Sequence, residues 1–185
     1  MSTTHYTING TTLTFARDTG ALTALSNPAC GRLVRGGRGL IDVAWPVKLR
    51  YEILRADPCG KHKPCPPEIE GDERGVTLTW QALPMNTVMP QLPELEGGVW
   101  AQVRITPWED GKSLCLSCRV ENRSQTPVRQ VLFPDLSGLL PVAGTDGTRF
   151  TGLKGYALPF RELRDEGDMK DQFYASKPSL CGKFY

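Results

Sequence analysis

Apolar and polar residues alternate with a period of two in segment after segment of the chain. In residues 76–82 and 47–53 every second side chain is apolar, and the residues between them are polar or charged. Because successive side chains of a strand point to opposite faces, this alternation is typical of half-buried strands. The apolar sets are Val76, Leu78, Trp80 and Ala82 in the first segment, and Val47, Leu49, Tyr51 and Ile53 in the second.

The clearest pair of strands surrounds Trp108–Lys112. Alternate residues are apolar from Val99 to Ile105 and again from Leu114 to Val120. The connecting segment contains Asp110-Gly111, and glycine adopts positive φ without steric cost, which favours a tight reversal. We therefore predict a β-hairpin across these residues.

Further strand signals lie near the start and after the hairpin. Thr12–Phe15 and Ala21–Leu25 flank the turn-like Arg17–Gly20, and Val128–Phe133 is a β-rich stretch that ends at Pro134. The 19 glycines and 15 prolines are spread along the chain, as the turns of a sandwich require. The pattern predicts an all-β, antiparallel two-sheet β-sandwich of one domain, residues 1–185.

Other segments do not follow this pattern. The one helical candidate, Pro159–Arg164, meets Gly167 too soon to be more than a short turn. Ala56–Gly75 and Leu83–Gly98 show neither period and are expected to be long loops, either functional, packed against a neighbouring domain, or plain insertions.

Charge and apolar runs exclude two classes of partner. Lys and Arg number 22 against 20 Asp and Glu, with the signs interspersed, so we expect no nucleic acid binding and no electrostatic membrane attachment. No apolar run approaches the ~20 residues of a membrane-spanning helix. The first residues lack a secretory signal, so a cytoplasmic location is expected if Met1 is the natural start.

The six cysteines are expected to be thiols, because export signals are absent and the chain is long enough to fold without disulfides. Cys59, His62 and Cys65 form a weak zinc candidate, with Cys30 or Cys181 as a fourth ligand, but the spacing matches no standard finger. A solvated loop is the favoured interpretation, and we expect no metal and no cofactor. Cys115 and Cys118 would point to opposite faces of a strand, with Cys118 in the core.

No catalytic residue is predicted. His5 and His62 are the only histidines, and no nucleophile motif accompanies them. Two tryptophans are carbohydrate-binding candidates: Trp100 falls opposite the apolar face of its strand, and Trp108 lies in the predicted turn. Exposed indoles offer flat apolar platforms for sugar rings. The alternative is that an adjoining domain or the second sheet covers them.

Three segments carry a resemblance to a known group of domains. The first two strands of galactose-mutarotase-like supersandwich domains, which stand at the N-terminus of many large glycoside hydrolases, resemble Ile8–Phe15 and Asp18–Asn27. A later segment, Phe133–Leu139, resembles part of a bacterial, poorly characterised group of such domains. The resemblance spans roughly residues 6–165. It implies a supersandwich fold, and a TIM barrel that follows the domain and carries the catalytic carboxylates.

Three functional hypotheses remain open. The first is a carbohydrate-associated module, non-catalytic by itself, that is part of a glycoside hydrolase or works with it as a partner chain. The second is a sugar mutarotase or epimerase, although hexose mutarotases use a histidine pair with a glutamate and neither His5 nor His62 matches a strand of that pattern. The third is a structural or protein-interaction sandwich.

Overall fold

Nearly all regular structure in the chain is antiparallel β-strand. The computed structural model describes residues 2–36, 39–49, 52–60, 65–86, 92–136, 138–140, 149–151 and 157–159. The chain divides into two compact units, residues 1–139 and 140–185. In the second unit, β12 (Arg149–Thr151) pairs with β13 (Ala157–Pro159). Helix among the described residues is limited to the 3-10 turn η1 (Pro93–Leu95), which confirms the all-β prediction.

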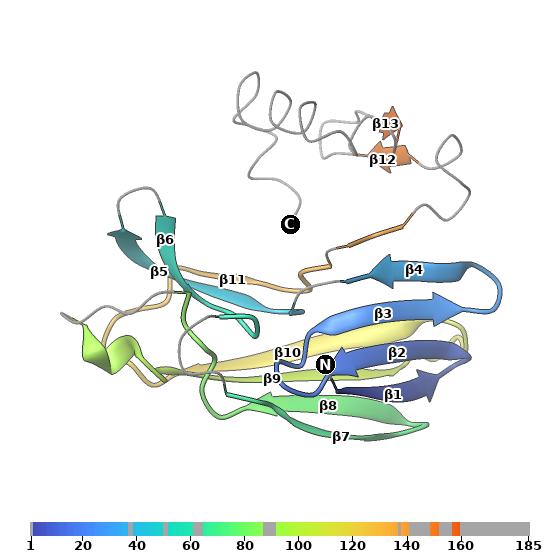
Figure 1. The fold of residues 1–185 in the computed structure, drawn as a ribbon, viewed down its shortest axis with the longest axis horizontal. Helices are drawn as coiled ribbons and strands as arrows, with labels where there is room; N and C mark the ends of the chain where they lie inside the picture. Colours follow the sequence, from blue (N-terminus) through green and yellow to red (C-terminus); the bar gives the residue numbers. More distant parts are fainter. Residues whose placement is uncertain are drawn as a thin grey trace. The chain divides into compact units, whose positions relative to one another are not determined.

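The first sheet is a simple antiparallel meander in the order β1-β2-β3-β4 (Figure 1). Its strands are β1 (Thr3–Ile8), β2 (Thr11–Ala16), β3 (Leu22–Asn27) and β4 (Gly31–Arg35). Asn9 and Gly10 connect β1 to β2 with φ of 49° and 71°, the two positive values that the commonest two-residue hairpin turn requires. The strands predicted on either side of Arg17–Gly20 are confirmed as β2 and β3.

The second sheet has the order β10-β9-β8-β7 and contains the predicted hairpin. Its strands are β7 (Glu68–Asp72), β8 (Gly75–Trp80), β9 (Val99–Pro107) and β10 (Leu114–Asn122). Asp110 holds the hairpin loop, since its Oδ1 accepts hydrogen bonds from the backbone N–H groups of Lys112 and Ser113 at 2.8 and 2.7 Å. Gly111 has a φ of 66°, so the role predicted for the Asp-Gly pair is confirmed.

The third sheet corrects one prediction. It consists of β11 (Gln130–Leu132), β5 (Asp42–Leu49) and β6 (Glu52–Ala56), in that order. Residues 47–53 were expected to form one strand, but Leu49 pairs with Glu52, so the chain reverses between them. The alternation of residue types continues through this reversal, and Arg50-Tyr51 contains no glycine, proline, asparagine or aspartate that would indicate a turn, so the sequence pattern reads as one strand.

The connection Ala56–Gly75 is also more structured than expected, because it contains β7. This edge strand pairs with β8 alone, and Ile69 is its one partly buried hydrophobic residue, so its apolar signal is weak. In the second predicted loop, the described part includes η1, whose Leu95 is fully buried. The helical candidate fails at Pro159, which ends β13, and its residues 160–164 lie outside the described residues.

The β1–β4 sheet lies over the β7–β10 sheet, and the apolar faces of the two sheets meet in a shared core (Figure 1). Trp45, Trp80 and Phe15 are the largest fully buried side chains. Hydrogen bonds join the two layers at both ends: Asn9 Nδ2 donates to Ser113 O at 3.1 Å, and Trp80 Nε1 donates to Thr19 O at 3.2 Å. The protein is therefore an antiparallel β-sandwich.

Cys118 does not lie in the core, contrary to the prediction. It is on the inner face of β10, opposite Val103, but β10 is the edge strand of its sheet and the residue is exposed. Partial burial of the thiol still disfavours the charged thiolate and raises the pKa of Cys118. Cys115 pairs with Thr106 and points to the other face, as the alternation predicts.

Candidate functional site

The two tryptophans selected from the sequence lie at opposite ends of β9. Trp100 is partly exposed on the outer face of the β7–β10 sheet, the face turned away from the core, between the buried residues Val99 and Ala101. Trp108 is in the β9–β10 loop and is 53% exposed. Eight residues of extended chain separate them by roughly 27 Å, so the structure does not bring the two indoles to one binding point.

Trp100 has a cation above its ring. The guanidinium carbon of Arg119, from the neighbouring strand β10, lies 5.6 Å from the ring centroid. Such a cation–π contact at an exposed site contributes about 0.5–1 kcal/mol. A sugar ring would therefore either displace Arg119 from the indole or stack beside it, and Trp108 is the more accessible platform of the two.

Strand register aligns polar side chains in rows across the outer face. Gln102 of β9 lies between Thr79 and Arg119, and its Nε2 donates to Thr79 Oγ1 at 3.2 Å. The next row runs from Glu70 through Thr77 and Arg104 to Ser117. Hydrogen-bonding groups thus cover the sheet between the two tryptophans.

A shallow hollow of about 440 Å³ lies on this face, towards the turn between β7 and β8. We call it the outer-face hollow. It presents two carboxylates and two guanidinium groups, a combination that offers strong hydrogen-bond acceptors and donors side by side. The lining residues are Glu70, Gly71, Asp72, Arg74, Gly75, Thr77 and Arg104.

The charged groups of the hollow are largely available to a ligand. Asp72 Oδ1 accepts a hydrogen bond from the backbone N–H of Arg74 at 2.7 Å. Within the described part of the chain, the Glu70 carboxylate and the Arg104 guanidinium form no hydrogen bond or ion pair with another residue. These two side chains face the solvent with their hydrogen-bonding capacity unused.

The sequence pattern does not predict this hollow, because it places β7 within the long loop Ala56–Gly75. One signal was present: Glu68, Glu70 and Asp72 alternate with Ile69 and Gly71, which is a period-two pattern whose outer positions are all acidic. Arg104 was visible as an outer position of β9. Its proximity to Glu70, however, depends on pairing across three strands.

The zinc candidate is only partly within the described residues. Cys59 is exposed and Cys65 is half-buried, while His62 and Cys181 lie outside the described residues. The Cys59 backbone N–H donates to Asp57 Oδ1 at 2.7 Å, so a local turn orders this point of the loop. Among the described residues no group of three histidine, cysteine or acidic side chains is arranged to hold a metal ion.

Comparison with known proteins yields no match to a family model, to a curated protein or to a solved structure. Among the described residues the structure contains no helix with the length and apolar character needed to cross a bilayer. The chain is thus placed by its fold class, an antiparallel β-sandwich, and its function must be inferred from the site itself.

Proposed function

We propose that this chain is a non-catalytic carbohydrate-binding module that works beside a glycoside hydrolase, as part of the same protein or as a partner chain. The outer-face hollow is the binding site in this proposal. Its free Glu70 carboxylate and Arg104 guanidinium are the observation that carries the proposal.

The chemistry of a sugar matches this arrangement. Each sugar hydroxyl is both a donor and an acceptor, so it can donate to a carboxylate and accept from a guanidinium at the same time. The Thr77 hydroxyl adds a third partner of either kind. Trp108, exposed beyond the same end of the sheet, offers the flat apolar surface on which the carbon–hydrogen face of a pyranose can stack.

Isothermal titration with xylohexaose, cellohexaose and maltohexaose tests the proposal. We expect at least one glycan to bind the wild type, and Arg104→Ala to weaken that binding about tenfold through loss of charge-assisted hydrogen bonds. Trp108→Ala should also weaken binding, and Trp108→Phe should restore part of it. Arg35→Ala, which removes an exposed arginine of β4, is the matched control.

Two results would contradict the proposal. If none of the three glycans binds, the chain has the character of a structural or protein-interaction sandwich instead. If a glycan binds but Arg104→Ala and Trp108→Ala bind it as tightly as the Arg35→Ala control does, the binding face is elsewhere.

A sugar mutarotase or epimerase is the second candidate, and the two carboxylates of the hollow favour it. Glu70 and Asp72 are two residues apart on one face of β7, so their Cα atoms are roughly 7 Å apart, close enough for both to reach one sugar ring. Polarimetry of freshly dissolved α-D-glucose and α-D-galactose distinguishes the candidates. A module leaves the uncatalysed rate unchanged, whereas an enzyme accelerates it and loses the effect in Glu70→Gln.

A further inference from the structure

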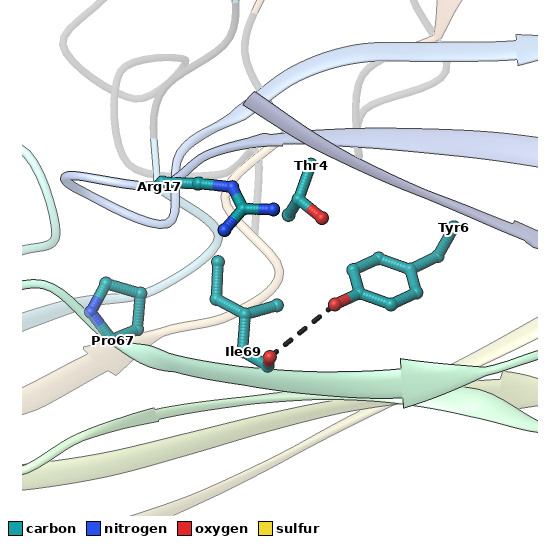
Figure 2. Close-up of a pocket in the computed structure, with 5 residues that line it drawn as sticks. All are labelled: Thr4, Tyr6, Arg17, Pro67 and Ile69. Atoms are coloured by element: carbon teal, nitrogen blue, oxygen red, sulfur yellow. Dashed lines mark hydrogen bonds between the residues drawn. The ribbon is translucent and has the colours of Figure 1, made fainter. Parts of the chain in front are cut away.

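A second hollow opens where the edges of the two main sheets meet, away from the outer face. It has a volume of about 210 Å³, equal to about seven water molecules, and is lined by Thr4, Tyr6, Arg17, Pro67 and Ile69. Figure 2 shows the Arg17 side chain extending from the β2–β3 turn towards Thr4, and the Tyr6 ring reaching from β1 towards Ile69. We call this hollow the edge cleft.

The cleft forms at the end of the sandwich where the inner row of β1 becomes polar and β2 gives way to the β2–β3 turn. On β1 the inner row is Ile8, Tyr6 and Thr4, and burial decreases along it from complete at Ile8 to partial at Thr4. On β2 the buried Leu13, Phe15 and Ala16 are followed by Arg17, an exposed residue of the β2–β3 turn. The β1–β2 register places Thr4 opposite Phe15, so both polar ends reach the same opening.

Arg17 is not neutralised by the protein. Its Nε donates to Thr3 O at 3.4 Å, while its two terminal nitrogens have no hydrogen-bond partner in the described part of the chain. None of the described carboxylates forms an ion pair with it, including that of its neighbour Asp18. A guanidinium that lines a cleft with its planar pair of donors free is suited to a carboxylate.

The hydroxyl of Tyr6 is available to a ligand as well. The ring is held by an aromatic contact with Phe15, at 6.5 Å between centroids and 53° between planes. Its hydroxyl donates to Ile69 O at 3.5 Å, the long limit for a hydrogen bond, so little is lost when it turns to a ligand. The hydroxyl of Thr4 lines the same cleft.

The opposite wall adds a small apolar surface to the cleft. Pro67 and Ile69, at the start of β7, present carbon surface to the cleft, and Pro67 is buried. The carbon skeleton of an organic acid can contact this surface, which gives it a modest advantage over inorganic phosphate.

We infer that the edge cleft binds a small organic carboxylate that also carries hydroxyl groups. Its carboxylate pairs with the free donors of Arg17, its hydroxyls meet Thr4 and Tyr6, and its carbon skeleton lies against Pro67 and Ile69. The site is separate from the outer-face hollow and does not depend on the proposed function.

The test is an amide NMR titration of the full chain with D-glucuronate, with D-glucose and inorganic phosphate as comparison ligands. D-glucose has the same ring but carries a neutral hydroxymethyl group in place of the carboxylate. We expect glucuronate to shift the amides of Thr4, Tyr6 and Arg17 with a dissociation constant on the order of 1 mM. Glucose and phosphate should bind at least about tenfold more weakly.

Variants locate the binding group. Arg17→Gln should weaken glucuronate binding about tenfold, Tyr6→Phe should weaken it less, and Arg35→Gln should leave it unchanged. The Arg17 side chain makes a single long hydrogen bond, and the backbone hydrogen bond of Arg17 to Ser2 O is kept in Arg17→Gln, so this variant should fold, which its amide spectrum will report. The inference is overturned if glucuronate causes no shift in these amides, if glucose or phosphate binds equally well, or if Arg17→Gln binds like the wild type. Shifts confined to the outer-face hollow would overturn it too, and would leave the proposed function standing.

Discussion

Gly20 gives the sharpest test of how the two sheets pack. It ends the turn between β2 and β3 with a φ of 73°, and a Cβ at this position would lie 2.6 Å from Trp80 Cζ2 and 2.8 Å from Pro67 Cγ. Both distances are shorter than real Cβ contacts, so Gly20→Ala forces the turn away from the second sheet. The same turn carries Arg17 and the Trp80–Thr19 hydrogen bond.

Two terms contribute to the cost of Gly20→Ala. A left-handed backbone conformation costs an alanine about 1–2 kcal/mol, and the forced overlap in a packed core costs about 1–3 kcal/mol more. Gly10→Ala is the matched control, because Gly10 has a φ of 71° but no atom within 4 Å of its Cβ position. It should show the first term alone, about 1–2 kcal/mol.

Urea denaturation followed by circular dichroism measures both variants. We expect Gly20→Ala to be less stable than Gly10→Ala by about 1–3 kcal/mol, which corresponds to a gap of about 2–12 °C in melting temperature for a chain of this size. Equal destabilisation of the two variants would refute the packing of the β2–β3 turn against Trp80, and with it the position of Arg17 in the edge cleft.

Arg55→Ala should lower the free energy of unfolding, measured by urea denaturation, by about 1–3 kcal/mol. The substitution removes the 2.6 Å ion pair between Arg55 and Asp42, and Asp42 is only 8% exposed and has an Oδ1 atom without a hydrogen-bond partner. A loss under about 0.5 kcal/mol would contradict this prediction. Hydrogen bonds from the Ser113 hydroxyl and from the Ser113 and Lys112 backbone lower the pKa of Asp110 below 3.8. The stabilisation from Asp110 is therefore complete only above about pH 5, and it is lost as pH falls through the unfolded-state and then the folded-state pKa. Asp110→Ala should reduce the loss of stability in acid, and an unchanged loss would be the contrary result. Burial raises the pKa of Cys118, so half-maximal alkylation of this thiol by iodoacetamide should need a higher pH in the folded chain than in the urea-unfolded chain. Equal midpoints in the two states would exclude the effect.

Local patterns predicted the parts of the fold that depend on neighbouring residues. The hairpin of β9 and β10 was predictable because its inner positions are apolar over the length of both strands and its loop contains Asp110-Gly111. The alternation also placed Trp100 on the outer face. In each case the strand, its turn and its partner are adjacent in sequence, so no long-range information is needed.

Other parts could not be predicted, for physical reasons that differ. The reversal between Leu49 and Glu52 contains no glycine, proline, asparagine or aspartate that would mark a turn, although the alternation of residue types continues through it. Strand β7 has one partly buried hydrophobic side chain, Ile69, so apolar periodicity hardly registers it. Cys118 has the parity of a core residue, and its exposure follows from the edge position of β10, which the order of strands alone determines.

Both candidate sites arise from strand register, which the sequence leaves open. Glu70 and Arg104 are 34 positions apart in the chain and share a row only because β7, β8 and β9 pair in one register. Thr4 and Arg17 each look like the ordinary polar end of a strand when taken singly. The register of β1 with β2, and the approach of β7 to Tyr6, bring these two ends to one opening beside Pro67 and Ile69. Because Thr4 belongs to one strand and Arg17 to the turn that follows its partner strand, only the pairing of the two strands brings both side chains to one opening. A pattern read along either segment by itself does not contain that information.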